Sequence, residues 1–129
     1  MAKHEEIRVE GLSEPISHYT DVVRFGNLAF ISGMGPLDAE GKLVGGEDVA
    51  AQARQVFVNI EKALKALGAS FADILKVTVY LTDVDDRTKI NPVRQQYFGK
   101  ARPASTLIGV GELAVPGMKV EIEAVVGLP

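Results

Sequence analysis

The sequence predicts an α+β domain in which one mixed β-sheet carries two helices on one face. Three observations predict this class: β-rich segments near both ends, a long amphipathic helix at residues 47–67, and a single strand between two helices in the middle. At 129 residues, with 47% hydrophobic and 24% charged residues, the chain fits a single globular domain over residues 1–129. We expect the element order ββαβαββ.

The N-terminal part predicts a β-hairpin. After a short candidate strand at residues 7–9 and a loop at 11–20, two β-rich arms at 22–25 and 28–32 flank the dipeptide Gly26-Asn27. This dipeptide tolerates the positive φ that tight hairpin turns require. The glycine-rich segment that follows, up to Gly46, predicts a loop.

The middle of the chain predicts helix, strand and helix. At residues 47–67, apolar residues recur every three or four positions, acids stand at the start and a glycine follows the end. The segment DILKVTVYLTD, residues 73–83, predicts a strand whose alternate residues share one face. A shorter helix is expected within residues 83–99, with Pro92 near its first turn or at a kink.

Two β-rich segments near the end of the chain predict a second hairpin. They are STLIGVGEL, residues 105–113, and KVEIEAVV, residues 119–126, with Pro116-Gly117 marking a turn between them. With both helices on one face of the sheet, an apolar opposite face would need a covering of partner subunits. A homo-oligomer is therefore expected.

Charge and composition argue against several function classes. The formal net charge of −3 argues against nucleic-acid binding, which needs clustered Lys and Arg. The chain has no Cys, which excludes disulfides and thiolate chemistry and fits a cytoplasmic location. No apolar run approaches the roughly 20 residues that span a bilayer, and the acidic N-terminal segment lacks a signal-peptide core, so no membrane association is expected.

The sequence does not predict a metal site. His4 and His18 lie in different segments, whereas zinc needs three or four convergent ligands. The acidic segment 83–86 resembles the start of a calcium loop, but the next ligand position holds Arg87. These acids are expected to cap the second helix.

Several polar positions have two interpretations. Glu121 and Glu123 either solvate the outer face of their strand, or one lines a cleft where desolvation raises its pKa towards the range of acid/base catalysis. Tyr19 and Asn91 are either structural hydrogen-bonding residues or ligands. The turn SGMG, residues 32–35, could present backbone N–H groups to an anion, but it matches no phosphate-binding fingerprint.

Taken together, these segments resemble the Rid family, the reactive intermediate deaminases of imines and enamines, also called L-PSP endoribonucleases or translation inhibitors. The resemblance covers ISHYTDVVRFGNLAFISGMGPLDAEGKLVG, DVAAQARQVFVNIEKALKALGASFADILKVTVYLTDVDD, Asn91, PAST and KVEIEA. It implies a chorismate-mutase-like fold and a homotrimer with an inner barrel and three clefts between subunits. It also implies hydrolysis of a small imine or enamine to a carbonyl product and ammonia, without metal or cofactor.

The resemblance assigns roles by position. Tyr19, Ser32, Gly33 and Asn91 match substrate-binding positions of the family. Glu121, the first acid of EIEA, matches the glutamate that positions or activates the water. This match favours the cleft interpretation for Glu121.

One family motif is altered. The family's P-A-R-S/T element supplies an arginine that grips the substrate carboxylate, whereas residues 103–106 read Pro-Ala-Ser-Thr, so Ser105 stands in the arginine's place. A charge-assisted hydrogen bond contributes about 1.5–3 kcal/mol, so losing a two-bond grip would cost on the order of 10²–10⁴ in transition-state stabilisation. Ser105 and Thr106 could still bind an uncharged group. The altered motif is therefore as consistent with a changed substrate range as with lost activity.

Two arginines are candidate substitute cations. Arg94 follows Asn91 by three residues, so the two share a helix face. Arg102 precedes Ser105 by three residues, so in an extended strand the two side chains would point to opposite faces. Each could instead be solvent-exposed or lie at a subunit interface. The segment 98–103 is also shorter than is usual in deaminating members, so the cleft wall could differ.

Three functional hypotheses follow. The leading one is a Rid-like hydrolase whose small-molecule substrate binds at subunit interfaces. The alternative is a non-catalytic small-molecule-binding or protein-interacting trimer of the same fold. RNA cleavage rests on the older family name alone, and the acidic charge balance argues against it.

Overall fold

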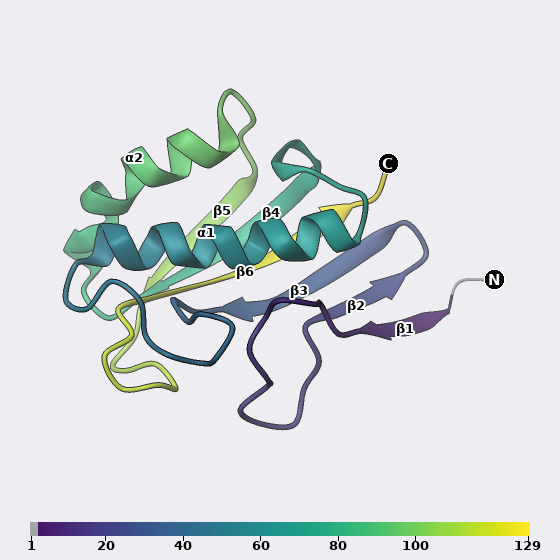
Figure 1. The fold of residues 1–129 in the computed structure, drawn as a ribbon. Helices are drawn as coiled ribbons and strands as arrows, with labels where there is room; N and C mark the ends of the chain where they lie inside the picture. Colours follow the sequence, from purple (N-terminus) through teal and green to yellow (C-terminus); the bar gives the residue numbers. More distant parts are fainter. Residues whose placement is uncertain (1–2) are drawn as a thin grey trace.

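Strand β6 (Val120–Gly127) lies in the middle of the sheet, although it is the last element of the chain. The computed structural model describes residues 3–129, and its six strands are ordered β1-β2-β3-β6-β4-β5. β6 pairs antiparallel with β3 (Leu28–Met34) on one side and with β4 (Ile74–Leu81) on the other, as Figure 1 shows. Within this sheet β3 and β4 are therefore joined only through β6.

The N-terminal strands confirm the predicted hairpin. β2 (Val22–Phe25) pairs antiparallel with β3, and Gly26 in the turn between them has φ +63°. Such a φ favours glycine, which has no Cβ to clash with the backbone. The candidate strand at 7–9 lies slightly earlier, as β1 (His4–Ile7) on the outer edge of β2, and it adds one strand to the expected order.

Helix α1 (Val49–Ala66) has nearly the predicted boundaries. The carboxylate of Asp48 accepts hydrogen bonds from the backbone N–H groups of Ala50 and Ala51 at 3.0 and 3.3 Å. Gly68 follows the helix with φ +68°, as expected of a residue that ends a helix. The apolar face of α1 is buried against the sheet.

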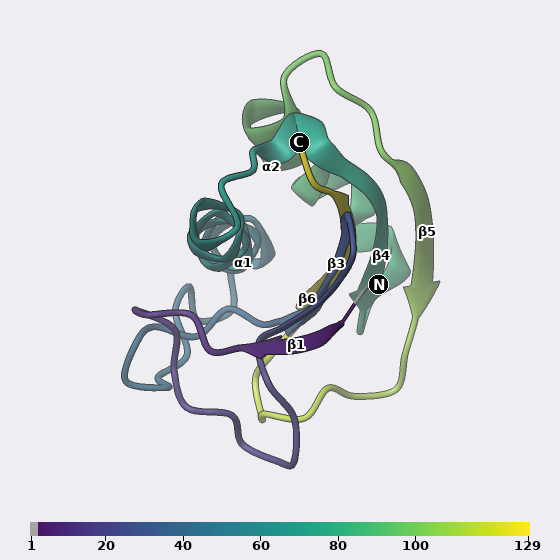
Figure 2. The ribbon, with the colours of Figure 1, turned by 90° about the vertical axis from the view of Figure 1, so that its right-hand side faces the viewer.

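Helix α2 (Arg87–Phe98) lies on the same face of the sheet as α1 (Figure 2). Aromatic rings join the two helices: the ring of Phe57 stacks on that of Tyr97 with 5.1 Å between centroids. The predicted capping of this helix by the acids 83–86 is wrong: Asp86 at the N-cap of α2 makes no side-chain capping bond, and Asp83 instead caps the short 3-10 turn Val84–Asp86 before it, accepting from the N–H of Asp85 at 3.0 Å. No helix in residues 3–129 is long and apolar enough to cross a membrane.

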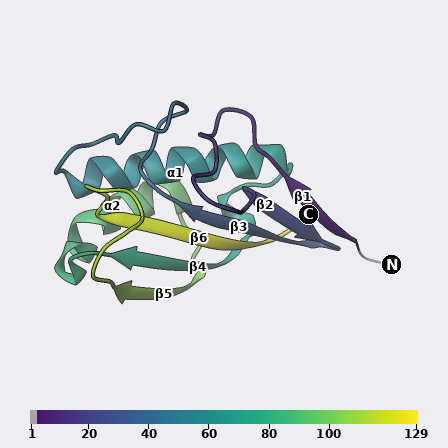
Figure 3. The same cartoon turned by 90° about the horizontal axis from the view of Figure 1, so that it is seen from below.

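The predicted C-terminal hairpin is wrong. β5 (Ala104–Gly109) pairs in parallel with β4 at the edge of the sheet, and β6 pairs with the other side of β4 (Figure 3). A parallel neighbour requires a crossover connection, which α2 provides. The turn signal Pro116-Gly117 belongs to the long loop that returns the chain from the edge to the centre of the sheet.

The sheet has one covered face and one open face. Along β6 the residues Val120, Ile122, Ala124 and Val126 are buried beneath the helices, and the residues between them point to the open face. Large apolar side chains also lie on the open face: Phe25 is 52% exposed, Phe30 46% and Leu75 51%. An exposed apolar face of this kind is typical of an interaction surface.

Gln52 fastens α1 to the loop that precedes β6. Its side chain is fully buried, and its Nε2 donates to the carbonyl oxygens of Gly46 at 2.7 Å and Gly117 at 2.9 Å. Its Oε1 accepts from the N–H of Lys119 at 2.7 Å. One side chain thus satisfies three backbone groups and fixes the course of this loop.

We expect Gln52→Leu to lower the free energy of unfolding by about 3 kcal/mol, because each buried backbone group left without a partner costs about 1–3 kcal/mol. Urea denaturation followed by circular dichroism measures the change. Gln96→Leu, at an exposed position of α2, is the control and should change the value by less than about 0.5 kcal/mol. A loss below about 1 kcal/mol for Gln52→Leu would show that the loop finds other partners.

Candidate functional site

Four of the predicted site residues line one hollow, where β3 ends and β6 begins. Tyr19, Ser32, Gly33 and Glu121 border a space of about 420 Å³. The remaining lining residues are Ile16, Ser17, Ala114 and Glu123. The structure therefore brings together side chains from the loop before β2, from β3 and from β6. We call this space the acidic hollow.

Gly33 leaves room for the carboxyl group of Glu121. A Cβ atom at position 33 would lie 2.9 Å from both Cδ and Oε2 of Glu121, which is closer than non-bonded carbon contacts allow. The hydroxyl of Ser32 donates to the carbonyl oxygen of Thr20 at 2.6 Å, and its N–H donates to that of Asp21 at 2.9 Å. These bonds tie the end of β3 to the loop that carries Tyr19.

Glu121 is half-buried beside a second carboxylate. Desolvation, and then the negative charge of Glu123, raise the pKa of Glu121 above its usual value. Glu123 accepts a hydrogen bond from the hydroxyl of Tyr80 on β4, and this bond is the main cause of the raised pKa of Tyr80. Both acids of EIEA thus line the hollow, and strand alternation had already placed them on one face.

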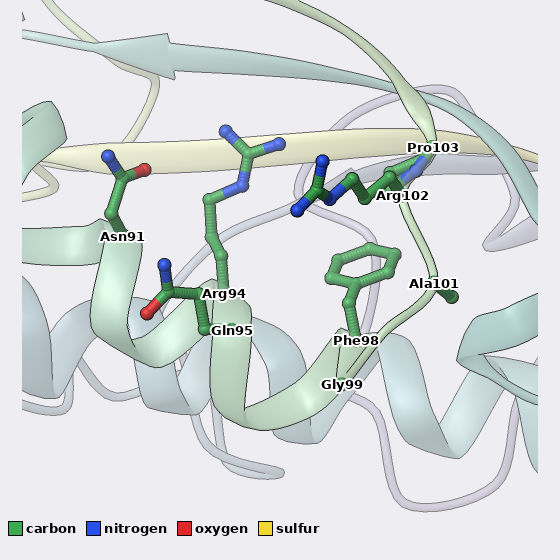
Figure 4. Close-up of a pocket in the computed structure, with 8 residues that line it drawn as sticks. All are labelled: Asn91, Arg94, Gln95, Phe98, Gly99, Ala101, Arg102 and Pro103. Atoms are coloured by element: carbon green, nitrogen blue, oxygen red, sulfur yellow. The ribbon is translucent and has the colours of Figure 1, made fainter.

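Three further predicted positions lie around a second cavity, between α2 and the 99–103 loop (Figure 4). Asn91, Arg94 and Arg102 contribute to this space of about 630 Å³, which we call the arginine cavity. Its further lining residues are Gln95, Phe98, Gly99, Ala101 and Pro103. Gln95 and Phe98 were missed in the sequence, although their spacing from Asn91 of four and seven residues is that of one helix face.

Arg94 is the cation that reaches Ser105. Its Nη2 donates a hydrogen bond to Oγ of Ser105 at 3.0 Å. In the parallel register Ser105 lies opposite Val77, which is buried on the helix-covered face, so the serine side chain points towards α2. Arg94 is half-buried, and desolvation lowers the pKa of its guanidinium without removing its charge near neutral pH.

Thr106 does not join Ser105. Its side chain points to the open face, where Oγ1 accepts a hydrogen bond from Nζ of Lys76 at 3.0 Å. Successive residues of a strand face opposite sides, so the two hydroxyls are separated by the sheet. Glu121 also belongs to the open face, whereas Arg94 approaches Ser105 from the helix side. Within one chain, the predicted site residues therefore form two separate groups.

The comparison with protein families covers both groups. The endoribonuclease L-PSP family matches residues 11–127. The chain belongs to this family, which is also called the Rid family. The match extends from the loop before Tyr19 to the end of β6, so the acidic hollow and the arginine cavity both lie within the Rid domain.

Named relatives of this Rid chain include imine and enamine deaminases. A RutC family protein of Pyrococcus horikoshii is 41% identical over 94% of this chain and 95% of its own length. The 2-iminobutanoate/2-iminopropanoate deaminase of Bos taurus is 40% identical over 85% of this chain and 80% of its own. The 3-aminoacrylate deaminase RutC of Acinetobacter baylyi is 35% identical, over 94% and 95%.

Solved Rid structures share the fold. RidA from the Antarctic bacterium Psychrobacter sp. has a TM-score of 0.88 and 32% identity, covering 96% of this chain and 99% of that one. TdcF of E. coli, solved with bound serine, has a TM-score of 0.88 and 31% identity, covering 97% and 99%. The central β6, the parallel β5 and the two helices on one face therefore form a Rid fold.

Glu121→Gln is expected to stabilise this Rid chain more at pH 7 than at pH 4. Because folding raises the pKa of Glu121, the folded chain keeps a proton that the unfolded chain loses from about pH 4.3 upwards. The contribution of Glu121 to stability therefore falls as the pH rises from the unfolded pKa to the folded one. The substitution removes this fall.

Urea denaturation of the native chain and of Glu121→Gln, at pH 4 and at pH 7, measures how much the substitution changes the free energy of unfolding at each pH. Glu112→Gln, at an exposed position, is the control and should show nearly the same effect at both values. If the gain from Glu121→Gln is equal at pH 4 and pH 7, the acidic hollow does not raise the pKa of Glu121.

Proposed function

We propose that this Rid protein is a cofactor-independent hydrolase of small reactive imines or enamines, acting at the interfaces of a homotrimer. One observation carries the proposal: the half-buried Glu121 and the Ser105-bound Arg94 lie on opposite sides of one sheet. A single chain cannot direct both groups at one small substrate. A second copy placed against the first would join the acidic hollow of one subunit to the arginine cavity of the next.

The open face supports assembly. Phe25, Phe30 and Leu75 are about half exposed there, and enclosing them between copies removes apolar area from water. Three sheets that close around a common axis, as the family resemblance implies, would cover this face in every subunit. RNA cleavage is not part of the proposal, because the net charge of −3 offers little attraction for a phosphate backbone.

Relatives support the substrate class. The bovine and Acinetobacter relatives are named as deaminases of 2-imino acids and of 3-aminoacrylate. The E. coli relative was solved with serine, a small molecule that carries one carboxylate and one nitrogen. A ligand of this type needs one group that grips a carboxylate and another that handles protons near nitrogen. The arginine cavity and the acidic hollow supply these two chemistries.

Glu121 serves as the base in the proposed mechanism. A water molecule adds to the imine carbon and gives a proton to the Glu121 carboxylate, which passes it to the imine nitrogen. The resulting carbinolamine collapses: its hydroxyl proton moves to nitrogen through the same carboxylate, the C–N bond breaks and ammonia leaves. One imine and one water thus give one carbonyl compound and one ammonia. Gly33 leaves the space that the Glu121 carboxylate occupies, because a Cβ atom at position 33 would clash with that carboxylate.

Arg94 takes over the carboxylate grip in this proposal. Ser105 is too short to bind a carboxylate as an arginine does, but it orients Arg94 with one hydrogen bond. A guanidinium has five N–H donors in a fixed plane, so four remain for a ligand. The cation therefore comes from α2 rather than from β5, which shifts the bound carboxylate and alters the substrate range.

Ammonia release from freshly generated 2-iminobutanoate tests the function. The native chain should accelerate release, and Glu121→Gln should lower kcat by about 10²–10⁴-fold, the usual contribution of a general base. Glu112→Gln is the matched control and should retain full activity. If 2-iminobutanoate, 2-iminosuccinate and a neutral enamine all fail to be hydrolysed, the hydrolase proposal is overturned in favour of a non-catalytic binding role. Equal activity of Glu121→Gln and the native chain would remove Glu121 from the mechanism.

Moving the arginine from position 94 to position 105 tests whether Arg94 binds the substrate carboxylate. Arg94→Gln should lower kcat/KM by about 100-fold, because two charge-assisted hydrogen bonds are lost. Adding Ser105→Arg to this variant should restore most of the loss, since the new guanidinium enters the arginine cavity from β5. Arg87→Gln, at an exposed position at the start of α2, is the control. A double variant no better than Arg94→Gln alone would contradict this assignment of the grip.

A further inference from the structure

The arginine cavity holds more positive charge than one carboxylate needs. Figure 4 shows Arg94 reaching from α2 and Arg102 from the 99–103 loop into the same space. Among residues 3–129 no Asp or Glu lines this cavity, and no carboxylate lies within 4.0 Å of either guanidinium. By contrast, Arg8 contacts both Asp21 and Glu14. The two cavity arginines thus have no acid of their own chain to balance them.

Both guanidiniums point into the cavity; that of Arg94 is fixed by a hydrogen bond, and that of Arg102 is exposed. Arg94 is fixed by Ser105, and its half-burial weakens the shielding of its charge by water. Arg102 is exposed, but it precedes Pro103, which restricts its backbone to extended conformations. Two like charges directed at one space repel each other. The occupant that removes this repulsion carries two negative groups.

We propose that Arg102 forms a second anion subsite and that the preferred substrate is a small dicarboxylic 2-imino acid. This rests on the proposed function, which assigns the first carboxylate to Arg94. The space of about 630 Å³ holds a four-carbon dicarboxylate with room to spare. The amides of Asn91 and Gln95, on the same helix face as Arg94, supply further donors to the carboxylate oxygens.

The acidic hollow favours the same orientation. Glu121 and Glu123 repel carboxylates, so a dianionic substrate keeps its acidic groups at the arginine cavity. The imine carbon is then directed towards Glu121 and the water. A substrate with only one carboxylate has fewer contacts that fix this orientation. Charge therefore selects both the substrate class and its direction in the cleft.

Two four-carbon substrates test the subsite. 2-Iminosuccinate and 2-iminobutanoate, generated in the assay by amino-acid oxidases from aspartate and 2-aminobutanoate, differ only in a terminal carboxylate in place of a methyl group. The native kcat/KM should be about tenfold higher for 2-iminosuccinate, and Arg102→Gln should remove this preference. Lys100→Gln is the matched control, because it removes a positive charge from the same loop without lining the cavity. It should keep the preference.

The outcomes separate the subsite from the proposed function. A native ratio near one, or a ratio that Arg102→Gln does not change, overturns the subsite even if both imines are hydrolysed. If neither imine is hydrolysed, the proposed function fails and binding decides the subsite. Succinate should then raise the Tm of the native chain more than butanoate does, and Arg102→Gln should abolish that difference. Equal shifts, or no shifts, overturn the subsite.

A third outcome concerns the neighbouring subunit. If Arg102→Gln dissociates the assembly and leaves the ligand preference unchanged, Arg102 pairs with a partner subunit and the subsite is overturned. Size-exclusion chromatography of the native chain, Arg102→Gln and Lys100→Gln distinguishes this case. Under the proposal all three elute alike.

Discussion

The central position of β6 is the constraint on which the core and the acidic hollow both depend. Its alternation sends Val120 and Ile122 into the core and Glu121 and Glu123 to the open face. A slip of one residue in its pairing would exchange these two sets and place a carboxylate beneath α1. Burial of the apolar set therefore fixes the register, and the fixed register places the acid. The same pairing of this strand thus sets both the burial of the core and the position of Glu121.

The parallel pairing of β5 with β4 has a second consequence, on the other side of the sheet. Because a parallel neighbour cannot follow through a tight turn, α2 must cross over the sheet before β5 begins. That crossover lays α2 above the first residues of β5 and brings Arg94 to Ser105. The segment 99–103, which closes the crossover, carries Arg102 to the same cavity. The topology thus brings Arg94 and Arg102 together from α2 and the segment after it, whereas the family motif places its arginine at the position of Ser105 in β5.

Local patterns predicted most of the fold, and the errors lie where distant pairing decides. The span of α1, the turn at Gly26 and the alternation of β6 follow from short-range periodicity and glycine placement. The position of β5 does not, because two β-rich segments with a turn signal between them suit a hairpin as well as a crossover. Helical spacing from Asn91 made Arg94 a candidate cation, but its bond to Ser105 could not be predicted, since it joins side chains of two elements whose packing depends on that crossover. Gln95 and Phe98 could have been predicted from helical spacing alone.

In the proposed function, serine at position 105 changes the origin of the cation rather than removing it. A guanidinium on α2 is half-buried against packed helices, so it is partly desolvated before any ligand binds. Among residues 3–129 no carboxylate lies within 4.0 Å of this guanidinium, so a bound anion would offset part of the free energy that its burial costs. An arginine on the exposed edge strand β5 would keep more hydration until the ligand binds, so it would lose more water on binding and gain less net free energy from the ligand. Under the proposed function, the helix-borne arginine would therefore discriminate more strongly between an anionic ligand and a neutral one, and Arg102 would extend that discrimination to a second negative group.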